Sequence, residues 1–209
     1  MRSRPSCPPG DVLVEREVAG RLLRARCSRR NAVRARSALE AFERGSVEPG
    51  VLMRFGWSAL SLQEADAALD VLEPDFEAWP HEQRWREGID VTLDVAEAQA
   101  RLLRITGSDS QDAAFDQVLL AVPRAVDLSR VFLRRVEPLA PEDSGWLLGP
   151  LDDPEALSRA DELERLPLAS LVARRPALLA PLALPVGFVA IVAGSSVKQV
   201  LDGAGRELL

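Results

Sequence analysis

The residues best suited to acid–base or metal chemistry are few in this chain, and they are not spaced for it. His81 is the only histidine among the 209 residues, and tyrosine is absent. The surrounding segment, His-Glu-Gln-Arg-Trp, lacks the second histidine one helical turn away that a zinc-binding helix requires. No serine lies in the Gly-x-Ser-x-Gly turn of the α/β-hydrolases. The sequence therefore indicates no catalytic set of these classes.

Two weaker patterns have ordinary structural explanations. The segment 194–198, Gly-Ser-Ser-Val-Lys, lacks both the first glycine and the Gly-Lys-Ser/Thr end of a phosphate-binding loop. Clustered aspartates are more often turn and helix-cap residues than metal ligands. These clusters are Asp109, Asp112 and Asp116, and later Asp152 and Asp153. We therefore predict no cofactor and no metal.

The charge is acidic overall and uneven along the chain. The net charge is −6, with an isoelectric point near 5.0. Residues 1–45 hold eleven arginines against five acidic residues, so the remainder carries a balance of −12. This excess disfavours a nucleic-acid-binding surface. Cys7 and Cys27 are too few for a disulfide scaffold, and no apolar run follows the basic N-terminus, so we expect a cytoplasmic protein without a signal peptide.

The elements that must position any site alternate between strands and helices. Strands are predicted at 12–18, 22–27 and 51–57, and the last has Met53 and Phe55 on its apolar face. An amphipathic helix is predicted from Asn31 to Gly45. The strongest helical periodicity covers 89–105, and Gly107 follows as its stop. The pattern indicates an α+β fold with a mixed or antiparallel sheet packed against helices.

The second half of the chain adds further predicted strands. The nearly continuous apolar run 115–122 indicates a central strand, and 131–136 and 186–193 are also predicted strands. The acidic stretch 152–165 is predicted to be a mobile connection, and 197–201 a terminal turn or helix. The uncharged run 177–197 approaches the length of a membrane span of about 20 residues. Pro181 and Pro185 interrupt it, however, so we predict no membrane segment.

The stretch 130–149 combines a strand, a proline-bounded loop and a Gly-Trp pair. Pro138 and Pro141 cannot donate ladder hydrogen bonds, so the strand is predicted to end near Glu137. Gly145 permits a close backbone approach that a Cβ atom prevents. Trp146 is interpreted as a core anchor behind a tight turn, in preference to a ligand-contacting residue.

The C-terminal third resembles the bacterial Immunity protein 33-like domain, which is found beside polymorphic and type VI secretion toxins. The resemblance covers about residues 117–193. Its sequence signature is Arg134-Arg135, Glu142 through Leu147 with Gly149, then 168–171, 175–179 and 184–187. The chain departs from the family pattern at Leu147-Leu148, where aromatic residues are expected. Residues interpreted as motif or structural positions are Trp57, Asp143, Ser144, Gly145, Trp146, Pro185 and Gly187.

The resemblance implies an immunity protein that binds and neutralises a cognate toxin without catalysis. Together with the residue pattern, it predicts a flexible tail 1–11, an N-terminal α+β region 12–116 and an Immunity protein 33-like region 117–209. The last region is either separate from 12–116 or continuous with it. The alternatives are a small-molecule-binding domain or enzyme with a tryptophan-lined pocket near Trp57, Trp79 and Trp146, or an oligomerisation module.

An acidic toxin-binding surface is the expected contact region, since many nuclease toxins present a basic groove. Binding residues concentrate in loops. The candidate contacts are Asp109, Asp112, Asp152, Asp153, Glu155, Asp161 and Glu162. A solvated acidic surface that only aids solubility is the competing explanation.

Overall fold

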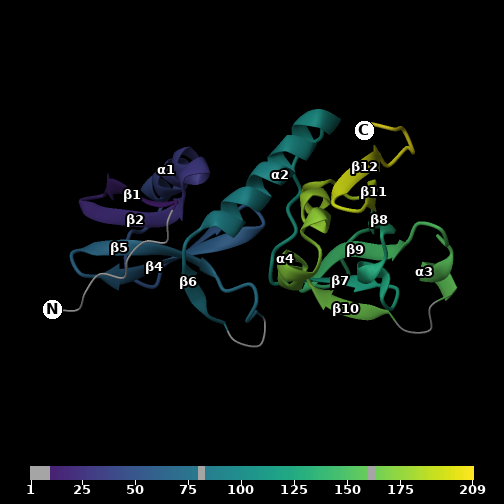
Figure 1. Cartoon of the computed structure of the whole chain (residues 1–209), viewed down its shortest axis with the longest axis horizontal. Helices are drawn as coiled ribbons and strands as arrows, with labels where there is room; N and C mark the ends of the chain where they lie inside the picture. The colour runs from purple at the N-terminus through teal and green to yellow at the C-terminus, as the bar shows by residue number, and fades with distance from the viewer. Residues whose placement is uncertain (1–9, 80–82, 160–162) are drawn as a thin grey trace. The chain divides into compact units, whose positions relative to one another are not determined.

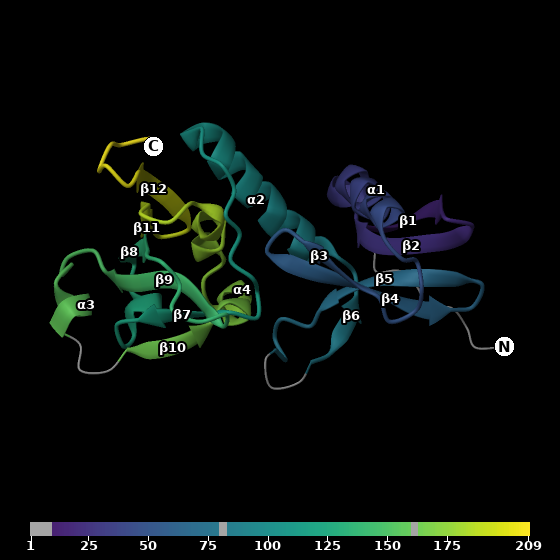
Figure 2. The ribbon, with the colours of Figure 1, turned by 180° about the vertical axis from the view of Figure 1, so that it is seen from behind.

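The chain divides into two compact units, each with its own sheet (Figures 1 and 2). The computed structural model describes residues 10–79, 83–159 and 163–209. The N-terminal unit comprises Met1–Asp75 and Arg84–Asp94, and the C-terminal unit comprises Phe76–Gln83 and Val95–Leu209. Both units combine a mixed sheet with short helices, so the predicted α+β class is confirmed.

The sheet of the N-terminal unit has six strands in the order β1-β2-β5-β4-β3, with β6 paired to β5. Strands β2 and β5 are parallel, with Leu23 opposite Leu69, and the remaining pairs are antiparallel. The strands are β1 (Asp11–Val18), β2 (Arg21–Ser28), β3 (Leu52–Phe55), β4 (Ser58–Ala65), β5 (Ala68–Pro74) and β6 (Trp85–Glu87).

Helix α1 (Ala32–Ala41) packs on β1 and β2 and closes the core of this unit. It is flanked by single 3-10 turns, η1 (Arg29–Asn31) and η2 (Phe42–Arg44). Alternate strand residues face the helix, as period-two patterning requires. Among them is the free Cys27, which is fully buried, and burial raises the pKa of its thiol to about 11.

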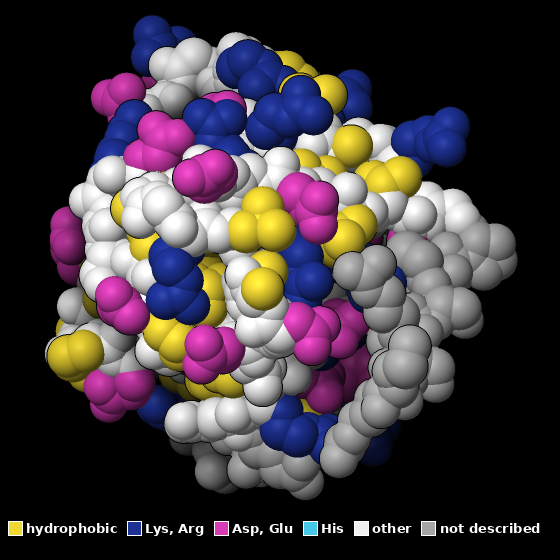
Figure 3. Space-filling model, turned by 90° about the vertical axis from the view of Figure 1, so that its left-hand side faces the viewer, with side chains coloured by type: hydrophobic (Ala, Val, Ile, Leu, Met, Phe, Trp, Pro, Cys, Tyr) yellow, Lys and Arg dark blue, Asp and Glu magenta, His cyan; other side chains and the backbone are white. Residues whose placement is uncertain are grey.

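Basic and acidic side chains are interspersed over the exposed face of this unit that Figure 3 shows. Arg16 pairs with Glu40 at 2.9 Å and with Glu43 at 2.7 Å, and Arg21 lies 3.8 Å from Glu64. The arginine excess near the N-terminus is thus partly neutralised by neighbouring carboxylates.

Helix α2 (Asp90–Thr106) starts in the N-terminal unit, where buried polar groups fix its first turn. Asp90 accepts hydrogen bonds from the Ser28 backbone N–H at 2.9 Å and from Asn31 Nδ2 at 2.7 Å. Glu73 Oε2 accepts one from the Thr92 backbone N–H at 2.8 Å. Its Oε1 accepts one from Arg86 Nη2 at 2.9 Å. Carboxylates are favourable at this end of a helix because the helix dipole is positive there.

The C-terminal unit contains a six-stranded sheet in the order β10-β7-β9-β8-β11-β12. Strands β7 and β9 are parallel, and the other neighbours are antiparallel. The strands are β7 (Val118–Ala121), β8 (Arg130–Arg135), β9 (Asp143–Pro150), β10 (Glu164–Pro167), β11 (Val189–Ala193) and β12 (Ser196–Leu201).

Short helical segments cover the core of this sheet. They are η3 (Ala125–Asp127), α3 (Ala156–Arg159), η4 (Leu168–Ser170), α4 (Leu171–Arg174), η5 (Pro176–Leu178) and η6 (Ala180–Ala183). Side chains from these segments, including Leu168, Leu178 and Leu182, are fully buried. Prolines at the start of η5 and η6 keep the chain in single turns, since proline cannot continue a helical hydrogen-bond ladder.

Four sequence-based predictions for this half differ from the structure. The acidic stretch 152–165 contains α3 and the edge strand β10, and 197–201 belongs to strand β12 instead of a turn or helix. The apolar run 115–122 forms a strand only over 118–121, because Phe115 instead packs against the rings of Phe76 and Trp79. The strand predicted for 186–193 begins at Val189.

The uncharged run 177–197 folds as 3-10 turns followed by the β11–β12 hairpin. Within the described part of the chain, no helix has the length and apolar character needed to span a bilayer.

Glu73 gives the N-terminal unit a testable dependence on pH. Burial raises the pKa of its carboxyl above the ordinary value of 4.5, despite the bonds from Thr92 and Arg86. The native state therefore holds this proton more tightly than the unfolded state, so this group's contribution to the free energy of unfolding falls as pH rises through the window above 4.5. We predict that the stability difference between wild type and Glu73→Gln decreases across that window.

Urea unfolding of both proteins at a series of pH values measures this difference. Glu64→Gln is the control, because its side chain is 66% exposed. A wild-type advantage that is flat or grows with pH contradicts the prediction.

Candidate functional site

Strands β8 and β9 form an antiparallel hairpin in the C-terminal sheet, joined by the loop 136–142. Arg135 lies opposite Trp146 at the loop end of the hairpin, and Val131 lies opposite Pro150 at the other end. The first four residues of β9 are the Asp-Ser-Gly-Trp motif, which the sequence placed between the proline-bounded loop and a short apolar exit. The motif therefore belongs to a strand and adjoins a proline-containing loop.

The side chain of Asp143 closes this loop onto the start of β9. Its Oδ1 accepts a hydrogen bond from the Gly145 backbone N–H at 2.8 Å, and its Oδ2 accepts one from Leu139 at 3.1 Å. The Asp143 N–H donates to the Ala140 carbonyl at 3.0 Å. Aspartate suits this position because its short carboxylate reaches backbone donors of the same turn.

Gln117 ties the loop to the segment before β7. Its Nε2 donates to the carbonyl of Pro141 at 2.8 Å and to that of Asp143 at 3.3 Å. The neighbouring Val118 N–H donates to the Glu142 carbonyl at 2.9 Å. Together with two prolines, these bonds fix the loop from both sides.

Gly145 permits the close backbone approach at the base of the loop. Its φ is +73°, and a Cβ atom placed on it would lie 2.2 Å from the carbonyl oxygen of Val136. The Gly145 carbonyl in turn accepts the Val136 N–H at 2.8 Å. Any other residue must both adopt a left-handed backbone and displace a main-chain oxygen.

Trp146 is a core residue with no exposed surface. Its Nε1 donates to the Leu182 carbonyl at 3.3 Å, which links β9 to η6. Ser144 is also buried, and its Oγ donates to the Val118 carbonyl at 2.7 Å. The side chains of Ser144 and Trp146 therefore hydrogen-bond within the interior of the unit, while the loop before them is exposed.

Arg135 is 4% exposed and lies with its guanidinium carbon 5.5 Å from the centroid of the Trp146 ring. Its Nη1 donates to the carbonyls of Gln111 and Leu184. Burial lowers the pKa of this guanidinium, and the nearby Asp112 and Glu137 act in the opposite direction. Its Nε has no hydrogen-bond partner among the described residues.

Pro185 and Gly187 shape the entry into β11 beside Arg135. The Gly187 N–H donates to the Arg135 carbonyl at 3.0 Å, and the Phe188 N–H donates to the Pro185 carbonyl at 3.3 Å. Gly187 has a φ of +90°, so the turn uses a backbone conformation that favours glycine.

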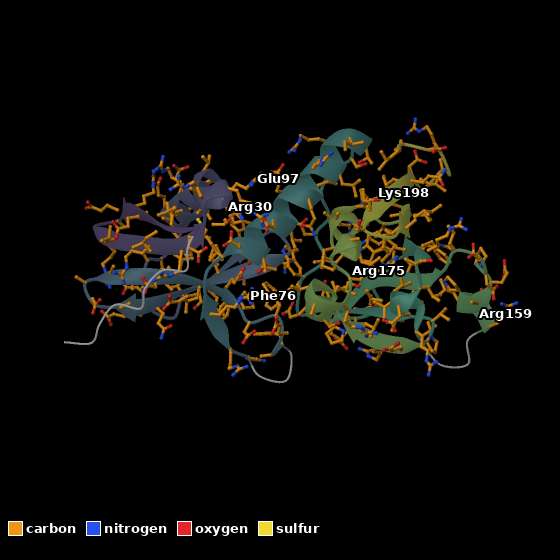
Figure 4. The ribbon with its side chains drawn as sticks, in the orientation of Figure 1. Arg30, Phe76, Glu97, Arg159, Arg175 and Lys198 are labelled. Atoms are coloured by element: carbon orange, nitrogen blue, oxygen red, sulfur yellow. The ribbon has the colours of Figure 1, made fainter. Side chains whose placement is uncertain are left out.

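A second buried arginine, Arg175, fixes the opposite end of β8. It is 9% exposed and extends into the C-terminal unit (Figure 4). Its guanidinium donates to the carbonyls of Val126, Leu128 and Ser129, the last at 3.0 Å. Both arginines thus satisfy main-chain carbonyls in place of carboxylates.

The predicted acidic contacts lie at opposite ends of the C-terminal sheet. Asp152 follows β9 and pairs with Arg130 at 3.1 Å, and Asp153 pairs with Arg159 of α3 (Figure 4). Glu155 is exposed in the same segment. Asp109 and Asp112 are exposed in the segment after α2, near the Arg135 end of β8. Asp161 and Glu162 lie outside the described residues.

The other residues that were candidates for a binding or catalytic role are not grouped into a site. Trp57 is fully buried in the N-terminal unit, whereas Trp79 and Trp146 belong to the C-terminal unit. Gly194 lies in the tight turn between β11 and β12. His81 is outside the described residues. In the part of the chain that the structure describes, no three His, Cys, Asp or Glu residues are grouped to hold a metal ion.

A scan against protein-family models matches the Imm33-like domain at residues 98–203, which is more than half of the chain. The chain belongs to the Imm33-like family. The match starts within α2 and extends through β12, so the Imm33-like domain includes the whole β8–β9 hairpin and both buried arginines. Searches of curated proteins and of solved structures found no match.

Sequence reasoning missed the loop residue with the largest exposed apolar side chain, Leu139, which is 91% exposed. It also missed Gln117, whose side chain hydrogen-bonds the loop backbone. Pro138 and Pro141 on either side of Leu139 were a sequence signal for a rigid loop, but the bonds from Asp143 and Gln117 follow only from the tertiary structure.

Substitution of Gly145 tests the close approach between the backbone at this position and the Val136 carbonyl oxygen. We predict that Gly145→Ala lowers the free energy of unfolding by more than the cost of a left-handed alanine, about 1–2 kcal/mol. The excess arises because the methyl group would meet the Val136 carbonyl oxygen. Denaturant unfolding followed by circular dichroism measures the loss.

Gly194→Ala is the matched control, since Gly194 also has a left-handed φ, +59°, in a hairpin turn but has open space at its Cβ position. Equal losses for the two variants contradict a specific role for the approach to Val136.

Proposed function

We propose that this protein is a bacterial immunity protein that binds a cognate secreted toxin in the cytoplasm and neutralises it without catalysis. The observation that carries the proposal is the match of the Imm33-like domain over residues 98–203. The name of the family suggests immunity proteins, and neutralisation by binding requires a stable recognition surface.

The geometry of the C-terminal unit supports this role. The β8–β9 loop is exposed, yet Asp143 and Gln117 hold its backbone by direct hydrogen bonds. A surface that is already ordered loses little conformational entropy when a partner docks. The fully buried Trp146 anchors the strand that carries the loop to the core.

The charge supports a basic partner. Residues 46–209 carry an excess of twelve acidic residues. Electrostatic attraction speeds association with an oppositely charged surface, such as the nucleic-acid groove of a nuclease toxin. In this proposal the Imm33-like region blocks such a surface and performs no chemical step.

The direct test uses the toxin encoded beside the gene for this chain. We predict that its expression in a laboratory bacterium stops growth and that co-expression of this chain restores it. The two purified proteins are expected to elute together in size-exclusion chromatography. An unrelated acidic protein of similar size, expressed at the same level, serves as the control for nonspecific charge effects.

Arrested growth despite comparable levels of both folded proteins, together with separate elution, would exclude neutralisation of this toxin. Loss of toxin after mixing, with a modified or cleaved product, would instead indicate an enzymatic role.

A further inference from the structure

Leu139 is the most exposed large hydrophobic side chain among the described residues. It is 91% exposed, compared with 77% for Val33 and 43% for Leu128. A single exposed leucine on a protein surface is ordinary. Leu139 differs because it lies at the tip of a loop whose main chain is held by hydrogen bonds on both sides of the leucine.

The restraints on this loop are local and independent of any partner. Leu139 donates its own N–H to Asp143, and Gln117 holds the Pro141 carbonyl. Pro138 restricts the backbone immediately before the leucine. The loop therefore presents an apolar side chain from an ordered backbone. In protein interfaces a few side chains that become fully buried carry most of the binding energy.

The carboxylates around this loop differ from those at the other end of the sheet. Glu137 and Glu142 flank Leu139 in the loop and are exposed, and Asp112 lies near Glu137 around Arg135. None of these three carboxylates has an ion-pair partner within residues 10–79, 83–159 and 163–209.

At the opposite end, acidic residues are already neutralised. Asp152 pairs with Arg130, Asp153 with Arg159, and Asp127 with Arg174 at 3.3 Å. Arg130 and Arg159 are exposed and would repel a basic partner, whereas Arg135, on which Asp112 and Glu137 act, is buried. The charge distribution thus favours the loop end of the β8–β9 hairpin.

We propose that the β8–β9 loop, with Leu139 at its tip and Glu137, Glu142 and Asp112 around it, is the surface that binds the toxin. This inference rests on the proposed function. The partner is a toxin whose basic face surrounds an apolar pocket. Leu139 enters the pocket, and the three carboxylates pair with lysines or arginines at its rim.

The decisive experiment measures binding of the purified toxin from the neighbouring gene to wild type and to Leu139→Ala. We expect Leu139→Ala to weaken binding about thirty-fold, the size typical of an anchor residue. Its melting temperature should equal that of wild type, because the side chain contacts little of its own protein. Leu128→Ala is the matched control, as an exposed leucine at the opposite end of β8, and should bind like wild type.

A charge variant tests the acidic rim separately. Glu137→Gln combined with Glu142→Gln should slow association and reduce its dependence on salt concentration. Asp152→Asn combined with Asp153→Asn should change both properties less, because these carboxylates lie at the opposite end of the hairpin from the loop and salt screens distant charges.

The outcomes separate this inference from the proposed function. If wild type binds and neutralises the toxin but Leu139→Ala binds equally well, the loop is not the contact surface, whereas the immunity role stands. If only the Leu128 or the Asp152 and Asp153 variants lose affinity, the surface lies at the opposite end. If wild type neither binds nor neutralises the toxin, both proposals fail. A wild-type dimer that Leu139→Ala converts to a monomer would assign the loop to self-association and overturn the toxin contact.

Discussion

The C-terminal unit depends on one close approach of two backbone segments, between Gly145 and the carbonyl oxygen of Val136. A Cβ atom at position 145 would lie 2.2 Å from that oxygen, so only glycine allows the hairpin to close there. The closure directs Trp146 into the core and leaves the loop 136–142 outside. One backbone constraint thereby places an anchor inside the unit and an exposed leucine on its surface.

The two buried arginines extend this organisation along β8. Arg135 and Arg175 donate to main-chain carbonyls at the two ends of the strand, in segments that have irregular or 3-10 structure. Such segments leave carbonyls without ladder partners, and a buried unpaired carbonyl destabilises the fold. The planar guanidinium has several donors in a fixed fork, which lets a single side chain satisfy several oxygens. The β8–β9 loop therefore adjoins an interior in which two arginines hydrogen-bond main-chain carbonyls.

Ion pairing gives the two ends of the C-terminal sheet different electrostatic character. Arginines pair with Asp127, Asp152 and Asp153, whereas Glu137 and Glu142 are exposed and form no ion pair among the described residues. Net charge alone does not show this difference, because it counts both groups of carboxylates equally.

The sequence by itself determined the α+β class, the long helix before Gly107, the strand that precedes Glu137 and the Imm33-like resemblance, because these follow from periodicity, turn residues and a local motif. It did not determine the edge strand β10, whose ladder hydrogen bonds come from β7, which is distant in the chain, or strand β12, whose pairing with β11 depends on the tight turn between them. Only the tertiary structure separated the predicted acidic contacts into two ends and placed Arg130 and Arg159 beside Asp152 and Asp153. Composition records the charges, but their pairing depends on which strands and turns meet in space.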